Sequence, residues 1–115
     1  MFRPVIAALL LLAAIGAEAG PAYVPGTEDV PLMPGLTSVA DSQLVFDKPQ
    51  GRIIQISARG VVHRADVLAF YGQSLPSLGW RRLDAQHFQR EGELLSFDFD
   101  GKDGDLTVAF TLRPH

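Results

Sequence analysis

The chain has 115 residues, 47% of them hydrophobic and 20% charged, with 10 Lys or Arg residues against 13 Asp or Glu residues. This length is typical of one small domain, and the net charge of -3 argues against a nucleic-acid-binding protein, because such proteins gather Lys and Arg to displace the counterions of phosphate. The sequence contains no Cys, which excludes disulfides, a thiolate nucleophile, a thiolate zinc site and lipid attachment through an N-terminal Cys.

The N-terminal segment has the features of a secretory signal peptide: a basic start at Arg3, an apolar run over residues 5–15, and the cleavage sequence Ala17-Glu18-Ala19. A transmembrane anchor is the alternative, but this run spans only about half of a bilayer core. We therefore expect residues 1–19 to be removed. The absence of Cys favours a bacterial periplasm over eukaryotic secretion, where small domains usually rely on disulfides.

Residues 20–42 form an arm that is rich in Pro and Gly. Because Pro lacks a backbone N–H, we expect neither a regular helix nor a central strand there. The segment from Val30 to Leu36 is too apolar for a solvated linker, and we expect it to lie extended on its own domain. The alternative is a polyproline-like strip that binds a partner.

A regular pattern begins after Ser42, so that residues 43–115 are expected to form the folded domain. Gln43 to Phe46 is predicted as a short strand, residues 47–51 as a turn, and Arg52 to Arg59 as a second strand. The second strand would present Ile54, Ile56 and Ala58 on one face.

An amphipathic helix is predicted from Arg64 to Leu75, because apolar residues recur at helical spacing. Its stripe consists of Val67, Leu68, Tyr71 and Leu75, with Leu78 continuing the spacing. Pro76 should end or kink the helix, and Gly79 suits the left-handed turn that follows.

Strands are predicted again after the helix, first from Trp80 to Leu83. A hairpin around Glu91-Gly92 would then pair Arg90 with Glu93, Phe88 with Leu95 and His87 with Ser96. If residues 101–104 form the next loop, a second hairpin sets Phe99 opposite Leu106, Phe97 opposite Val108 and Leu95 opposite Phe110.

The fold class predicted from these elements is α+β, with a single antiparallel sheet of about five strands in the order β-β-α-β-β-β. One helix would cover the sheet face that carries Phe88, Leu95, Phe97, Phe99, Leu106, Val108, Phe110 and Leu112. The opposite face would carry small and polar residues, namely Gln55, Ser57, Arg59, His87, Ser96, Thr107, Ala109 and Thr111. Water commonly covers such a face, whereas the alternative is that this face or an uncovered strand edge receives a partner strand.

The helix and the strand after it carry the pattern FYxxxLPxxGW, formed by Phe70-Tyr71, Leu75-Pro76 and Gly79-Trp80. This pattern resembles small exported bacterial domains and lipoproteins of unknown function, in which a helix leads through "GW" into a strand meander. The resemblance covers residues 51–113 and implies the fold but no activity. The chain departs from the lipoprotein members because it lacks their anchoring Cys.

The acidic stretch from Asp98 to Asp105 superficially resembles a calcium loop, because hard cations take several carboxylate oxygens. It fails the EF-hand pattern, since Lys102 and Asp103 occupy the positions of a ligand and of the turn Gly. A solvated turn is the simpler interpretation. The predicted register nevertheless sets Asp100 opposite Asp105, a repulsive pair that a cation would relieve.

Other reactive residues form no recognisable constellation. Ser74 lies in a sequence close to GxSxG, but Pro76 replaces the second Gly and the position is late in a helix. His63 and His87 lie in no motif with a nucleophile or a paired carboxylate. A small basic spot at Arg81, Arg82 and Arg90 is an alternative to ordinary surface arginines.

We therefore predict no catalytic, cofactor-binding or metal-binding residues and no cofactor. The expected function is that of a non-enzymatic periplasmic interaction module, which binds an envelope protein through its arm, a sheet edge or the open face. The alternative is an exported protein that binds a small ligand or, weakly, calcium. We expect no nucleic-acid partner, and no stable membrane span after signal cleavage.

Overall fold

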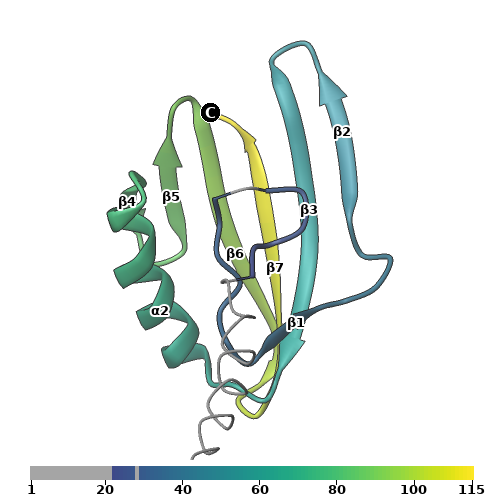
Figure 1. Ribbon diagram of the computed structural model, residues 1–115, viewed down its shortest axis with the longest axis vertical. Coiled ribbons are helices and arrows are strands. Elements are labelled where there is room, and N and C mark those ends of the chain that lie inside the picture. Colours follow the sequence, from purple (N-terminus) through teal and green to yellow (C-terminus); the bar gives the residue numbers. More distant parts are fainter. Residues whose placement is uncertain (1–21, 28) are drawn as a thin grey trace, which may run out of the picture.

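The computed structural model describes residues 22–27 and 29–115, so the predicted signal peptide and its cleavage site lie outside the described residues. These residues form a seven-stranded antiparallel sheet and one helix (Figure 1). The elements are β1 (Leu36–Ser38), β2 (Leu44–Lys48), β3 (Gly51–Gly60), α2 (Arg64–Ser77), β4 (Arg81–Asp84), β5 (His87–Arg90), β6 (Glu93–Lys102) and β7 (Asp105–Pro114). No helix in the described ranges is long and apolar enough to span a membrane.

The α+β class with a single antiparallel sheet and one helix is confirmed, but the predicted strand count and order are wrong. Three strands precede the helix rather than two, and four follow it rather than three. The additional early strand is β1, a three-residue edge strand, which begins only after Pro34 and Gly35 and is therefore not blocked by them. After the helix, β4 to β7 form a continuous meander in which each strand pairs with the next.

The sheet runs in the order β1, β3, β7, β6, β5, β4, and β2 also pairs with β3. β1 pairs with residues 58–60 of β3 and β2 with residues 51–55, on the side of β3 away from β7. The two strands therefore form one interrupted edge. The segment between β1 and β2 is bound to β3 through Ser42, whose hydroxyl oxygen accepts a hydrogen bond from the Ser57 N–H at 3.1 Å.

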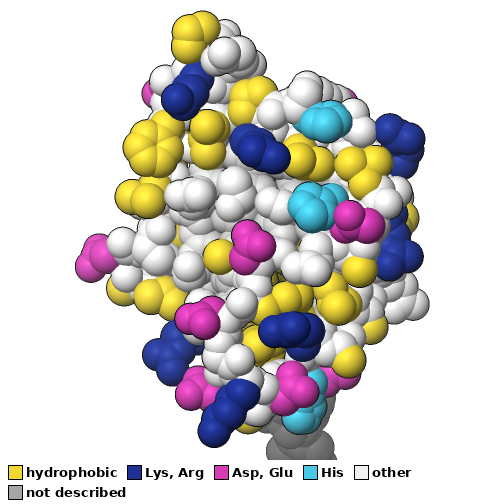
Figure 2. All heavy atoms as spheres, turned by 180° about the vertical axis from the view of Figure 1, so that it is seen from behind, with side chains coloured by type: hydrophobic (Ala, Val, Ile, Leu, Met, Phe, Trp, Pro, Cys, Tyr) yellow, Lys and Arg dark blue, Asp and Glu magenta, His cyan; other side chains and the backbone are white. Residues whose placement is uncertain are grey.

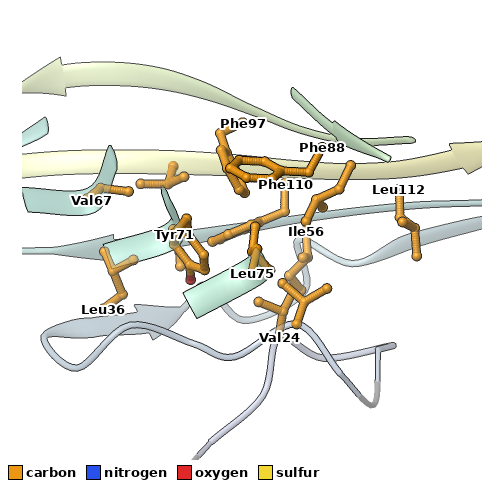
Figure 3. Close-up of a cluster of buried hydrophobic side chains, with 14 of the residues drawn as sticks. Val24, Leu36, Ile56, Val67, Tyr71, Leu75, Phe88, Phe97, Phe110 and Leu112 are labelled. Atoms are coloured by element: carbon orange, nitrogen blue, oxygen red, sulfur yellow. The ribbon is translucent and has the colours of Figure 1, made fainter. Parts of the chain in front are cut away.

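The helix covers one sheet face with Val67, Tyr71 and Leu75, which are fully buried (Figure 3). They pack on the predicted strand face, of which Phe99 alone is only partly buried. The helix extends two residues beyond its predicted end, because Pro76 lies inside α2, which ends at Ser77. The expectation that Leu78 continues the apolar stripe is wrong: Leu78 lies beyond the helix and is 41% exposed, and the chain turns at Gly79 (φ 95°) into the buried Trp80.

The first C-terminal hairpin has the predicted register, with Arg90 opposite Glu93, Phe88 opposite Leu95 and His87 opposite Ser96. The register predicted for the second hairpin is wrong by two residues. Phe97 lies opposite Phe110, and the strands pair as far as Lys102 opposite Asp105. The turn is therefore formed by Asp103-Gly104 alone rather than by residues 101–104, because Gly101 adopts a positive φ of 88° and stays within β6.

Candidate functional site

The most exposed apolar segment of the described chain is β2, an edge strand. All five of its residues are exposed, with Leu44, Val45 and Phe46 at 49%, 52% and 49%. No backbone hydrogen bond links β2 to any element other than β3 within residues 22–27 and 29–115. One row of its N–H and C=O groups therefore faces away from the sheet, and such a row is a template for pairing with another strand.

The hairpin of β2 and β3 extends beyond the rest of the sheet (Figure 1), because residues 51–53 of β3 pair only with β2. By register, Leu44 and Phe46 share the open face with Ile53, and Val45 lies on the face of Ile54. Beside them, a shallow hollow of about 320 Å³ is lined by Lys48, Gln50, Ile53, Arg113 and Pro114. The exposed edge thus has apolar side chains on both faces and two cations near its tip.

The opposite edge, β4, is protected in two ways. Its pairing with β5 is shifted between Arg82 and Asp84, and three of its four residues are charged. Bulges and charges each discourage strand addition. β2 has only Asp47 and Lys48 at its end for this purpose. The two edges therefore differ in their readiness to accept a strand.

The sheet face away from the helix carries the small and polar residues predicted for it, as the strand register places them there. Figure 2 shows this face with a white area of backbone and uncharged polar side chains, with charged and hydrophobic side chains scattered around it, and with a group of hydrophobic side chains at the flank where β2 lies. Water is a sufficient partner for such a surface. The open face therefore offers less to an apolar partner than the β2 edge does.

The apolar residues of the Pro/Gly-rich arm pack on their own domain. Val24, Val30 and Leu36 belong to the buried core, at 1%, 0% and 6% exposure. The Tyr71 hydroxyl anchors the segment by donating a hydrogen bond to the Pro31 carbonyl at 2.7 Å and accepting one from the Met33 N–H at 3.1 Å. Much of the apolar surface that suggested a partner-binding strip is therefore used internally.

The acidic stretch near the last turn is occupied by structural contacts. Asp103 accepts a hydrogen bond from the Arg64 N–H at 2.8 Å, at the start of α2, where no side chain of the N-cap residue does so. Asp105 pairs with Arg59 at 3.0 Å. Asp100 lies opposite Thr107 rather than Asp105, so the predicted repulsive pair does not form. In the described part of the chain, no three His, Asp or Glu side chains gather as a metal site requires.

Replacing Asp103 with alanine is expected to lower the free energy of unfolding by about 1 kcal/mol, the usual loss for a helix cap. The first turn of α2 would also lose a favourable negative charge. Urea unfolding measures the effect, with Asp100→Ala as a control of the same charge change. Calcium addition tests the structural role of the whole acidic stretch. Millimolar calcium should leave the melting temperature of the unaltered protein unchanged, whereas a calcium-dependent rise would contradict the structural role of Asp98 to Asp105.

The residues considered for nucleophilic chemistry are not brought together. The Ser74 hydroxyl makes no hydrogen bond, and His63 is the exposed N-cap residue of α2. The arginines considered as a basic spot are also not gathered, since by register Arg81 and Arg82 lie on opposite faces of β4, in line with ordinary surface arginines. Arg90 instead lies over the Trp80 ring, 4.6 Å from its centroid, and pairs with Asp29.

One polar pair was missed in the sequence. His87 Nδ1 lies 2.8 Å from Asp84 Oδ1, and the same carboxylate oxygen accepts a hydrogen bond from the Gln86 N–H at 2.8 Å. The spacing of three residues across a tight turn was its only signal. The two side chains are 44% and 62% exposed, so the pair stabilises a surface turn.

The hydrogen bond with His87 makes the largest contribution to lowering the pKa of Asp84, and the hydrogen bond from the Gln86 N–H makes the second largest. A carboxyl group whose pKa is lowered by folding stabilises the folded state above its unfolded pKa of about 3.9, and this contribution is lost as pH falls through the folded pKa. An NMR titration of the Asp84 carboxyl should show a higher pKa in His87→Ala than in the unaltered protein. His63→Ala is the control, and an equal rise there would contradict the pairing.

Together, the fold and the edge define a small α+β protein whose sheet is open along one apolar edge strand. No protein-family model, curated protein or solved structure matches the chain.

Proposed function

We propose that this protein is a non-enzymatic interaction module of the bacterial periplasm, which binds an extended protein strand along β2. The observation that carries the proposal is the exposed run of Leu44, Val45 and Phe46 on an edge with free backbone groups. Backbone hydrogen bonds would supply affinity, and apolar side chains on both faces would supply selectivity.

The contrast with β4 supports a role for this edge. An apolar edge strand exposes a protein to aggregation, and the charges and the shift in pairing on β4 show how the same sheet avoids this hazard elsewhere. The export of the module is inferred from the signal-like sequence of residues 1–19 and from the lack of Cys.

Site-specific photo-crosslinking tests the proposal directly. A photoreactive residue in place of Phe46 should give a discrete protein adduct in the envelope of the source bacterium, and the same residue in place of Arg82 on β4 should not. Adding Val45→Lys to the Phe46 probe should abolish the adduct, because a charge on the edge opposes strand addition. The proposal fails if both positions give the same adducts, or none.

These edge substitutions are better probes than deletion of the arm. A chain that begins at Ser42 would lose Val24, Val30 and Leu36 from the core, so a loss of binding could reflect unfolding. Phe46 and Val45 are about half exposed, so their replacement tests the edge with the core intact.

A further inference from the structure

The sequence of β2 is complementary to itself. When an edge strand pairs antiparallel with a second copy around a two-fold axis, residues directly opposite one another lie on the same sheet face. Because successive side chains alternate between faces, the axis must then lie midway between the two copies of one residue, which is called here an axis through that residue. In β2, three central choices exist, at Val45, Phe46 and Asp47.

An axis through Val45 gives the best matched pairs. Val45 lies opposite its own copy on the face of Ile54, and Leu44 of each copy lies opposite Phe46 of the other on the open face, so all six apolar side chains have an apolar cross-strand neighbour. Gln43 then lies opposite Asp47, and a side-chain amide is a suitable hydrogen-bond donor to a carboxylate. Aromatic and aliphatic residues in direct cross-strand contact stabilise a sheet.

The other two registers are poorer. An axis through Phe46 sets Leu44 opposite Lys48 and Val45 opposite Asp47, so two apolar residues of each copy face charged residues. An axis through Asp47 places two carboxylates directly opposite each other, which is repulsive. With the axis at Val45, the two Asp47 residues are separated by four positions, about 13 Å along the strands. Each Asp47 also has Arg52 as its cross-strand neighbour on β3.

We infer that a second copy of this chain occupies the β2 edge, in the antiparallel register that sets Val45 opposite Val45. The inference rests on the proposed function of β2 as a strand-binding edge and names its partner. The two sheets would join into one, with Leu44 of each copy beside Phe46 of the other on the open face. The overlap involves residues 42–48 only, so its area falls below the roughly 1,200 Å² of stable interfaces and the dimer is weak.

The lack of native Cys allows a clean test by disulfide trapping. Directly opposite residues in an antiparallel pair have Cα atoms about 4.5 or 5.5 Å apart, within the range that a disulfide bridges. Val45→Cys should therefore form a covalent dimer under mild oxidation at least about tenfold faster than Phe46→Cys, whose two copies are offset by two positions. Leu83→Cys, on the β4 edge and 43% exposed, measures random collision.

Two further measurements complete the design. Adding Leu44→Lys to Val45→Cys should reduce the rate to that of Leu83→Cys, because lysine then replaces leucine opposite Phe46 of the second copy. Unchanged far-ultraviolet circular dichroism and melting temperature would show that each variant is folded. The rate should rise with protein concentration up to about 1 mM, as a weak association requires.

The outcomes separate this inference from the proposed function. Dimerisation of Val45→Cys at the rate of Leu83→Cys, or fastest dimerisation of Phe46→Cys, would overturn the inference. If the Phe46 photo-probe still captures a different protein in that case, β2 binds a strand as proposed, but its partner is that protein and not a second copy of the chain. Capture of another copy of the chain by the same probe supports both proposals, and capture of nothing removes both.

Discussion

Gly60→Ala is expected to destabilise this protein by about 3 kcal/mol or more, which is at the upper end for overpacking. A Cβ atom at Gly60 would lie 2.0 Å from the Gly35 carbonyl oxygen and 3.0 Å from the Gly35 carbonyl carbon. Both atoms belong to the backbone, so no side-chain rotation relieves the contact. Because Gly60 pairs with Leu36, the arm and β1 would have to move away from the sheet. Urea unfolding measures the loss.

Gly72→Ala provides a matched control, because it makes the same chemical change inside α2. Apart from its chain neighbours and the backbone of its own helix, no atom of the described residues lies within 4 Å of a Cβ at Gly72. Alanine is favoured over glycine in a helix by about 0.5–1 kcal/mol, so this variant should be more stable than the unaltered protein. Equal stability of the two variants would contradict the close approach of the arm to β3.

The hairpin of β5 and β6 could be predicted residue by residue because its turn chemistry is local. Glu91 and Gly92 have positive φ values of 50° and 80°, and the Glu-Gly pair at the centre of two alternating segments signals such a turn. With the turn fixed, the register of Phe88 opposite Leu95 follows without any knowledge of the rest of the chain.

The register of β6 and β7 could not be determined in the same way. Side chains alternate with a period of two, so a slip of two residues leaves every apolar residue on the same face. Phe97 therefore fits equally well opposite Val108 and opposite Phe110, its true partner. The predicted loop over residues 101–104 contains Gly101 and Gly104, both of which have positive φ, and the sequence does not show that only Gly104 belongs to the turn.

Features of the candidate site escaped prediction because they depend on contacts between distant residues. Leu44 to Phe46 were predicted as a strand from their apolar composition, whereas the turn predicted over residues 47–51 is wrong, because Asp47 and Lys48 continue β2 and pair with Arg52 and Gly51. An apolar strand is more typical of a sheet interior, and only the topology places this strand at the edge. The contact of Asp103 with the start of α2 joins residues 39 positions apart. No local pattern in the sequence encodes either arrangement.

Tyr71→Phe is expected to lower the free energy of unfolding by about 1–3 kcal/mol, the usual loss when buried groups lose their hydrogen-bond partner. Phenylalanine keeps the ring, which packs 4.8 Å from Phe97 and 5.7 Å from Phe110 between centroids. It removes the hydroxyl that binds the Pro31 carbonyl and the Met33 N–H. The Met33 amide should therefore exchange with solvent faster. Tyr23→Phe is the control, because Tyr23 is 43% exposed.

The decline of the free energy of unfolding at alkaline pH provides a second test of the role of the Tyr71 hydroxyl. Burial raises the pKa of Tyr71, outweighing the opposing effect of the Met33 N–H. The unfolded chain then releases this proton at about pH 10 while the folded protein retains it. The contribution of Tyr71 is therefore fully present below pH 10 and is lost as pH rises further, since the unfolded state binds fewer protons there. Tyr71→Phe should show a shallower alkaline decline, and an unchanged decline with unchanged Met33 exchange would show that the hydroxyl does not anchor the arm.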